Sequence, residues 1–313
     1  MSWGGEHGVR ISLSAVVMAL HSGRLCALTT ETAEGELALP SGPFDPANDR
    51  TFELALRAFV TAQTGFKLGF VEQLYTFGDA GRDAPRATPG PDQLREISVG
   101  YLALTSDAVD MTPPGARWTG VLELFPWEDR RGGGRAALDT IMLCLSRWAA
   151  GDARRKARID ALFPSEASQR WDEARVLERF ELLYETGLVA EAVRDRDDAR
   201  LIDLGDRPMA SDHRRILATG LGRLRSKLRY RPVLFELAPE TFTLSELQAA
   251  AEAVVALSLH KQNFRRGVER TGLVAPTGCL STGTGGRPAE LFRYTGAANA
   301  DGQAPGLALP ALR

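Results

Sequence analysis

The stretch ALPSGPFDPANDRTFELALRAFVTAQTGF, residues 38–66, decides the fold prediction for this chain. Its second half predicts an amphipathic helix, because apolar side chains recur there every three or four residues. The apolar stripe consists of Phe52, Ala55, Leu56, Phe59, Val60 and Ala62. Glu53 and Arg57 are spaced i, i+4, and Gly65 is placed to cap the C-terminal end of the helix. By itself this pattern indicates only a helix that packs on a core.

Strands are predicted on both sides of this helix. The apolar run 11–20 leads through His21-Ser-Gly-Arg24 into a second run at 25–29, which predicts a hairpin. Further strands are expected at 70–77 and 97–104. The last of these alternates poorly, which indicates that both faces of the sheet are covered.

The stretch 42–66 resembles the signature of Nudix phosphohydrolases, G-x5-E-x7-R-E-U-x-E-E-x-G-U, in which U is aliphatic. The register is set by Gly65 and Phe66. The signature Gly, Glu, Arg-Glu and Glu-Glu then fall, in that order, on Phe44, Arg50, Ala58-Phe59 and Ala62-Gln63. Magnesium prefers carboxylate oxygens, which these residues do not supply. We therefore expect a retained fold with no catalytic residues and no metal site.

The last third of the chain predicts a winged helix-turn-helix, with a helix, a turn, a second helix and a glycine-tipped hairpin. Thr243 and Glu246 form a capping-box pattern before the first helix. Its apolar face consists of Leu244, Leu247, Ala251, Val254 and Val255. The second helix is expected to begin near His260, and the hairpin strands are expected at 273–275 and 290–294.

The second of these helices is rich in side chains that bind DNA. Asn and Gln pair with adenine, Arg pairs with guanine, and flanking cations contact phosphates. The DNA-binding candidates are Lys261, Gln262, Asn263, Arg265, Arg266 and Arg270, with Arg287 at the hairpin tip. An ordinary exposed basic helix has a similar composition, but the capped helix before it and the wing after it favour DNA contact. Arg287 fits a DNA contact and a structural turn equally well.

Three motifs follow one another along the chain: EQLYTFGDAGRD with REISVGYLAL at 72–104, FTLSELQ followed by KQNFRR, and GRPAELFRY. In this order they resemble the Nudix-related transcriptional regulators of NAD metabolism, the NrtR-type proteins and their NadQ branch. The resemblance covers the chain to about residue 124 and again from 213 to 294. Residues from about 130 to 206 have no counterpart in the shorter NrtR pattern, and their length favours the NadQ branch.

This resemblance implies a homodimeric repressor of NAD biosynthesis or salvage genes that binds a palindromic double-stranded DNA operator. It implies no cofactor, but an adenine nucleotide effector, either ADP-ribose, ATP or NAD, bound by the inactive Nudix-like domain. The candidate effector-binding residues are Arg57, Gly78, Asp79, Arg82 and Asp83. A plain chain turn is the alternative role of Gly78 and Asp79. Whether the effector weakens or strengthens DNA binding stays open.

The fold class expected is α+β, with a Nudix-like mixed β-sheet sandwich, a helical insertion and a C-terminal winged helix-turn-helix domain. The sensing domain is expected at 1–231 with its insertion at about 132–200, the winged helix at 232–296 and a flexible tail at 297–313.

The insertion is expected to follow a flexible break, EDRRGGGR, at 128–135. Helical patterns come next, at 136–150, 152–162 and 165–193. We expect these helices to cover the sheet or to form a dimer contact, without a ligand role. The charge run 194–200 predicts a solvated turn, and 214–228 predicts the last helix of the domain.

Composition fits a regulated DNA-binding protein. A chain of 313 residues with 44% hydrophobic content can build two cores, and a net charge of -2 argues against indiscriminate coating of nucleic acid. A local basic face is nevertheless predicted before the winged helix. Its residues are Arg207, Arg214, Arg215, Arg223, Arg225, Lys227, Arg229 and Arg231.

The three cysteines, Cys26, Cys144 and Cys279, are far apart and lack C-x-x-C spacing. They predict neither a disulfide framework nor a zinc site, which favours a cytoplasmic location. No membrane segment is expected, since the apolar run 11–20 is too short to span a bilayer.

Two other functional classes fit parts of the sequence. The chain could be an active Nudix hydrolase of a nucleoside diphosphate derivative that uses Glu53, Glu72, Asp79 or Asp83 as relocated acids. The winged helix could instead bind another protein and no DNA.

Overall fold

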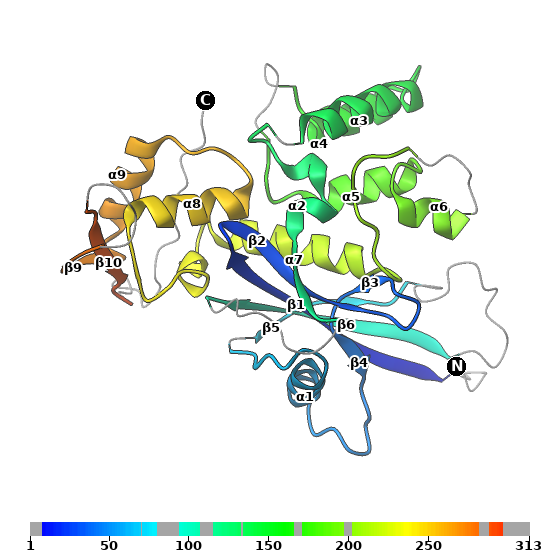
Figure 1. The fold of residues 1–313 in the computed structure, drawn as a ribbon. Helices are drawn as coiled ribbons and strands as arrows, with labels where there is room; N and C mark the ends of the chain where they lie inside the picture. Colours follow the sequence, from blue (N-terminus) through cyan, green and yellow to red (C-terminus); the bar gives the residue numbers. More distant parts are fainter. Residues whose placement is uncertain are drawn as a thin grey trace, which may run out of the picture.

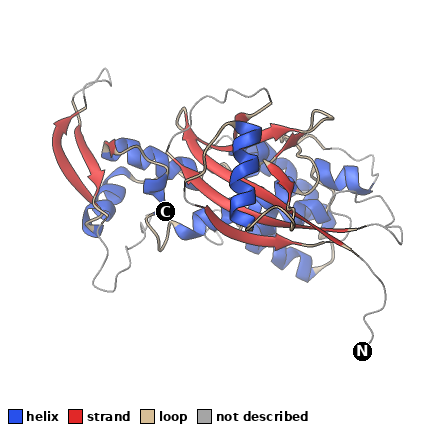
Figure 2. Ribbon diagram, turned by 90° about the horizontal axis from the view of Figure 1, so that it is seen from below, coloured by secondary structure: helices blue, strands red, loops and turns tan. Residues whose placement is uncertain are grey.

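The computed structural model describes residues 8–69, 71–79, 94–106, 115–132, 134–165, 171–196, 202–281 and 288–296. In these ranges a central sheet has helices on both faces, and a smaller helical domain with a strand hairpin lies at one end of it (Figures 1 and 2). None of the helices in the described ranges is long and apolar enough to cross a membrane.

The sheet is built around two long strands, β1 (Val9–His21) and β6 (Arg95–Thr105), which pair in parallel. β2 (Arg24–Glu31) returns antiparallel to β1, and β5 (Val71–Phe77) pairs antiparallel with β6. Shorter strands extend the sheet, namely β3 (Leu37–Ala38) and β7 (Arg117–Gly120) beside β2 and β4 (Ser41–Pro43) beside β1. The predicted hairpin and the two later strands are thus confirmed.

One face of the sheet is covered by α1 (Phe52–Thr64), which crosses it in Figure 2. Thr51 accepts a hydrogen bond from the Leu54 amide at the start of α1, and Gly65 ends the helix with a φ of 70°. The predicted amphipathic helix and its glycine cap are confirmed. Side chains that alternate along β1 and β6 enter two separate buried clusters, so both faces of β6 are covered as predicted.

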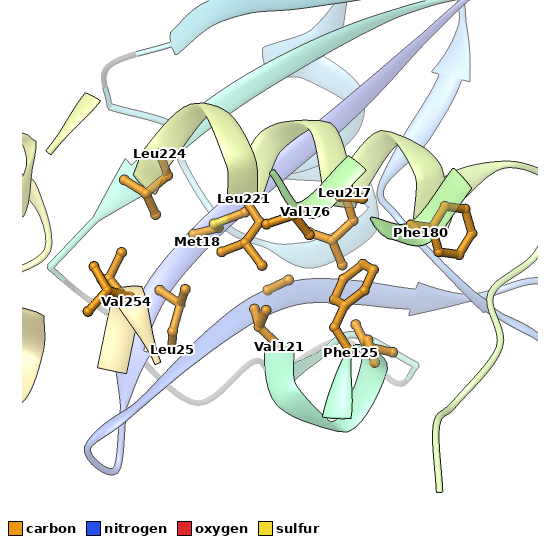
Figure 3. Close-up of a cluster of buried hydrophobic side chains, with 14 of the residues drawn as sticks. Met18, Leu25, Val121, Phe125, Val176, Phe180, Leu217, Leu221, Leu224 and Val254 are labelled. Atoms are coloured by element: carbon orange, nitrogen blue, oxygen red, sulfur yellow. The ribbon is translucent and has the colours of Figure 1, made fainter. Parts of the chain in front are cut away.

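The opposite face is covered by α7 (His213–Lys227), α5 (Val176–Glu185) and α2 (Val121–Leu124). Figure 3 shows Leu217, Leu221 and Leu224 of α7 directed toward the buried core. Gly220 lets α7 approach β1, since a Cβ there would lie only 2.7 Å from Cγ1 of Val16. The helix predicted at 214–228 is confirmed.

The insertion contains α3 (Arg135–Trp148), α4 (Ala153–Leu162) and α6 (Ala190–Arg196), with α5 between the last two. The first two agree with the helical patterns in the sequence. The single helix predicted at 165–193 is wrong, because the chain turns between α5 and α6 at Gly187, where φ is 73°.

Two other predictions for this region are corrected. The flexible break does not begin at Glu128, because Glu128 ends a buried 3-10 turn, Pro126–Glu128, and is fully covered. The solvated turn predicted from residue 194 is wrong at its start, since α6 continues to Arg196. Arg194 there donates to the main-chain oxygens of Met209 and Ser211 at 3.0 and 2.7 Å.

The C-terminal domain follows a 3-10 turn at Val233–Glu236 and begins with β8 (Thr241–Phe242). It continues with α8 (Leu244–Val255), α9 (Lys261–Thr271), β9 (Val274–Leu280) and β10 (Glu290–Tyr294). The strands form a separate sheet in the order β8, β10, β9. Both hydrogen bonds of the predicted capping box are present between Thr243 and Glu246, and β9 is longer than the sequence predicted.

Candidate nucleic-acid interface

Helix α9 is held by an apolar edge and presents its other sides to solvent. Phe264 and Val268 are buried in the same core cluster as the side chains of α8. The helix begins at Lys261 with His260 at the N-cap position, as the sequence predicted. Since Phe264 and Val268 are the buried residues of α9, its other side chains are exposed or half-buried.

The DNA-binding candidates on α9 do not have equal access to solvent. Those that are exposed are Lys261, Gln262, Asn263, Arg266 and Arg270. Arg265 is half-buried and donates from Nη2 to the Ser245 hydroxyl at 3.2 Å. Arg266 donates to Oδ1 of Asn263 at 3.2 Å, which holds these two exposed side chains together. Arg287 lies outside the described residues.

The sequence reading missed one exposed residue of α9, Glu269. The available signal was spacing, because position 269 follows Gln262 and Arg266 at i+7 and i+3 and therefore lies on the same side of a helix.

The basic face predicted before the winged helix is wrong for most of its residues. Seven of its residues form ion pairs with acidic side chains: Arg207, Arg214, Arg215, Arg223, Arg225, Lys227 and Arg229. Arg214 and Arg225 are among the most buried side chains of the protein. These residues therefore join elements of the fold, and their charge is largely neutralised by their partners.

One of these ion-pair clusters is centred on the carboxylate of Glu128, which is fully buried between Arg179 of α5 and Arg225 of α7. Arg179 donates to its two oxygens at 2.6 and 2.9 Å, and Arg225 donates to Oε2 at 2.6 Å. Burial by itself raises the pKa of the Glu128 carboxyl, but the two guanidinium groups outweigh burial and hold its pKa below the usual range. Glu128 is therefore ionised at neutral pH.

Arg225 of this cluster and the main chain of Arg130 also contact the C-terminal end of α8. Nε of Arg225 donates to the main-chain oxygen of Val254 at 2.8 Å, and the Arg130 amide donates to the main-chain oxygen of Ala256 at 2.9 Å. Carbonyls at the end of a helix lack partners inside the helix and favour a nearby cation. Figure 3 shows Val254 in the cluster that also contains Leu25 of β2 and Leu224 of α7. The winged domain is thus packed and hydrogen-bonded onto the sheet domain.

The candidate effector residues that the structure describes lie at opposite ends of β5. Arg57 pairs with Glu53 and donates to the main-chain oxygens of Leu68 and Gly69, before β5 begins. Gly78 and Asp79 follow the other end of β5, where Asp79 pairs with Arg215 of α7. Arg82 and Asp83 lie outside the described residues. None of the described candidates lines either of two surface cavities, of about 310 and 540 Å³.

At the Nudix signature, Gln63 has a structural role. Its side-chain amide donates to the main-chain oxygen of Ser41 at 2.7 Å and accepts from the Ser41 amide at 3.2 Å. These two bonds join α1 to β4, and they use the N–H and C=O groups of Ser41 as a neighbouring strand would.

The acids of the hydrolase alternative are dispersed. Glu53, Glu72 and Asp79 pair with Arg57, Lys227 and Arg215, respectively. Within the described ranges, no group of three or more His, Cys, Asp or Glu side chains is arranged to hold a metal ion.

Comparison with known proteins matches the C-terminal domain to a family. Residues 234–294 match the NrtR DNA-binding winged helix domain. A curated relative, the ADPR responsive transcriptional repressor NtrR of Acinetobacter baylyi, is 38% identical over 86 residues. That alignment covers 28% of this chain and only 34% of the relative, so it spans about a third of the relative's length.

Solved structures extend the likeness to the whole fold. NrtR of Shewanella oneidensis matches with a TM-score of 0.52 at 20% identity, covering 91% of this chain and 93% of that one. The same protein complexed with a 27mer DNA matches with a TM-score of 0.51 at 22% identity and the same coverage. A MutT/nudix family protein from Enterococcus faecalis matches with a TM-score of 0.54 at 13% identity, covering 94% of this chain and 89% of that one.

Together, the sheet with helices on both faces and the capped two-helix domain with its strand hairpin agree with the predicted α+β class. Residues 234–294 match the NrtR DNA-binding winged helix domain, and the fold of the chain is similar to that of Shewanella oneidensis NrtR, with a Nudix-like sheet domain.

Proposed function

We propose that this protein is a transcriptional repressor that binds a palindromic operator as a homodimer and responds to an adenine nucleotide. The observation that carries this proposal is the match of residues 234–294 to a DNA-binding family, combined with the exposure of Gln262, Asn263 and Arg266 on α9. Amide and guanidinium groups on one exposed helix suit the base edges of the major groove. The genes controlled are those of NAD biosynthesis or salvage, and ADP-ribose is the first effector to test, since the curated relative is an ADPR responsive repressor.

Each proposed domain has its own role. Residues 1–231, with the insertion at about 132–200, sense the effector, residues 232–296 bind DNA, and 297–313 form a tail. An effector changes DNA affinity only by the difference between its affinities for the two states of the protein. We infer that a shift in the sensing domain acts on α8 through the contacts from Arg225 and Arg130, and on α9 through the core that α8 and α9 share.

A gel-shift assay tests the DNA-binding half of the proposal. The wild-type protein should retard duplex fragments from promoters of NAD synthesis genes, and ADP-ribose should change the apparent Kd. Arg265→Ala with Arg266→Ala should abolish the shift while ADP-ribose affinity, measured by calorimetry, stays unchanged. Arg154→Ala, at an exposed site on α4, is the matched control and should bind DNA normally. Undiminished shifts by the double variant would refute the assignment of α9.

An activity assay tests the absence of hydrolysis. Purified protein with magnesium and ADP-ribose should release no product, because the signature positions hold Ala62 and Gln63 and the nearby acids are dispersed. Turnover that disappears in Glu53→Gln or Asp79→Asn would make the protein an enzyme instead.

A further inference from the structure

The exposed side of α9 contains an acidic residue in the middle of its DNA-binding candidates. Gln262, Arg266 and Glu269 lie within an arc of about 60°, because successive residues of a helix are about 100° apart. The buried Phe264 and Val268 lie on the other side of the helix. We call the surface formed by Gln262, Arg266 and Glu269 the reading face.

The neighbouring arginines leave the Glu269 carboxylate available. Arg265 and Arg266 lie one turn before it, but Arg265 donates to Ser245 and Arg266 donates to Asn263. Within the part of the chain that the structure describes, Glu269 forms no ion pair, although intrahelical pairs of this spacing form readily elsewhere, as between Glu53 and Arg57. The side chain is exposed, so its carboxylate faces solvent as an acceptor.

A free carboxylate on a surface that approaches DNA is repelled by phosphates and needs a donor. Base edges in the major groove offer two donors, the N4 amino group of cytosine and the N6 amino group of adenine. The adenine donor lies beside the N7 acceptor, which repels a carboxylate and suits an amide instead. Cytosine is therefore the base edge that a glutamate recognises.

We propose that Glu269 is a specificity-determining residue that accepts a hydrogen bond from the N4 amino group of one cytosine in each operator half-site. This inference rests on the proposed DNA-binding function. Gln262 and Glu269 are seven residues apart, so about 10 Å of helix separates them. The cytosine therefore belongs to a different base pair from the one that Gln262 contacts. Glu269 also disfavours DNA sequences that place a hydrogen-bond acceptor or a phosphate beside its carboxylate.

Selection from a duplex library with a randomised interior tests the proposal. The wild-type protein should enrich one cytosine per half-site, and replacing that base pair should lower its affinity about 5- to 150-fold. Glu269→Ala should bind all four versions of that pair within about twofold of one another. Glu269→Gln should shift the preference to adenine, since an amide pairs bidentately with adenine. Glu240→Gln, at an exposed site outside α9, should keep the wild-type preference.

The outcomes distinguish an error in the role of Glu269 from an error in the proposed DNA binding. If the Glu269 variants keep the full wild-type preference at every position, the role of Glu269 is wrong while DNA binding stands. If the wild-type protein enriches no sequence at all, both this inference and the proposed function fail. Thermal unfolding of the variants should match the wild type, because the Glu269 side chain is exposed and makes no ion pair with the described residues.

Discussion

Arg225 and Val254 join the two domains: Nε of Arg225, on α7, donates to the main-chain oxygen of Val254, on α8, at 2.8 Å. The same guanidinium donates from Nη1 to Glu128 at 2.6 Å. One buried side chain thus connects the Glu128 carboxylate to α8, the first helix of the C-terminal domain.

Loss of the Arg225 guanidinium should destabilise the whole protein. Arg225→Met leaves Glu128 buried with Arg179 as its remaining cation, and removing one partner of a buried ion pair costs about 3–5 kcal/mol. Urea unfolding followed by circular dichroism measures this loss. Arg223→Met is the control, because Arg223 is on the same helix, its side chain is 43% exposed and it lies 4.0 Å from Glu72. That variant should stay within about 1 kcal/mol of the wild type. Equal losses in the two variants would contradict the role of Arg225.

Protonation of Glu128 at low pH should lower the free energy of unfolding of the protein. The folded pKa of this carboxyl is lowered, so its contribution to stability is present above the unfolded pKa, about 4.3, and is lost as pH falls through the folded pKa. The unfolding free energy, measured between about pH 7 and pH 3, should therefore decline once the pH falls below about 4.3, the ordinary pKa of glutamate. In Glu128→Gln the decline should be shallower, and stability at neutral pH should be lower. Parallel curves for the two proteins would show that Glu128 does not titrate on unfolding.

The close approach of α7 to β1 should make Gly220 intolerant of a side chain. Gly220→Ala places a methyl group 2.7 Å from Cγ1 of Val16, and overpacking of this kind costs about 1–3 kcal/mol. The thermal midpoint should fall. Combining it with Val16→Ala, which removes the clashing methyl groups, should cost less than the sum of the two single changes. Strict additivity of the two losses would argue against the contact.

Salt dependence should distinguish a phosphate contact from a base contact on α9. Lys261→Ala should weaken binding to all duplexes alike and lower the slope of log affinity against log salt by about 0.9 per half-site. Gln262→Ala should leave that slope unchanged and relax the preference at one base pair. Fluorescence anisotropy with a labelled duplex at several salt concentrations measures both quantities. An unchanged slope for Lys261→Ala would remove that residue from the set of phosphate contacts.

Local features were predictable because their causes lie within one or two turns of the chain. The capping box needs only Thr243 and Glu246, three residues apart, and the end of α1 needs only Gly65 after an amphipathic repeat. The hairpin between β1 and β2 follows from two apolar runs and a short polar turn. The helix break at Gly187 was missed because the apolar pattern continues across it.

The sequence by itself determined the β1–β2 hairpin, α1 and its cap, α7, and the capped two-helix pattern with the residues of α9. Only the tertiary structure decided which charged residues face a partner and which hold the fold together. Glu128 and Arg225 are 97 positions apart, and Arg225 and Val254 are 29 apart, so no local pattern relates them. The sequence of an arginine-rich stretch does not show whether each guanidinium is hydrated at the surface or paired with a buried carboxylate. Here α7 packs between the sheet, the insertion and α8. Its cations are therefore paired within the protein.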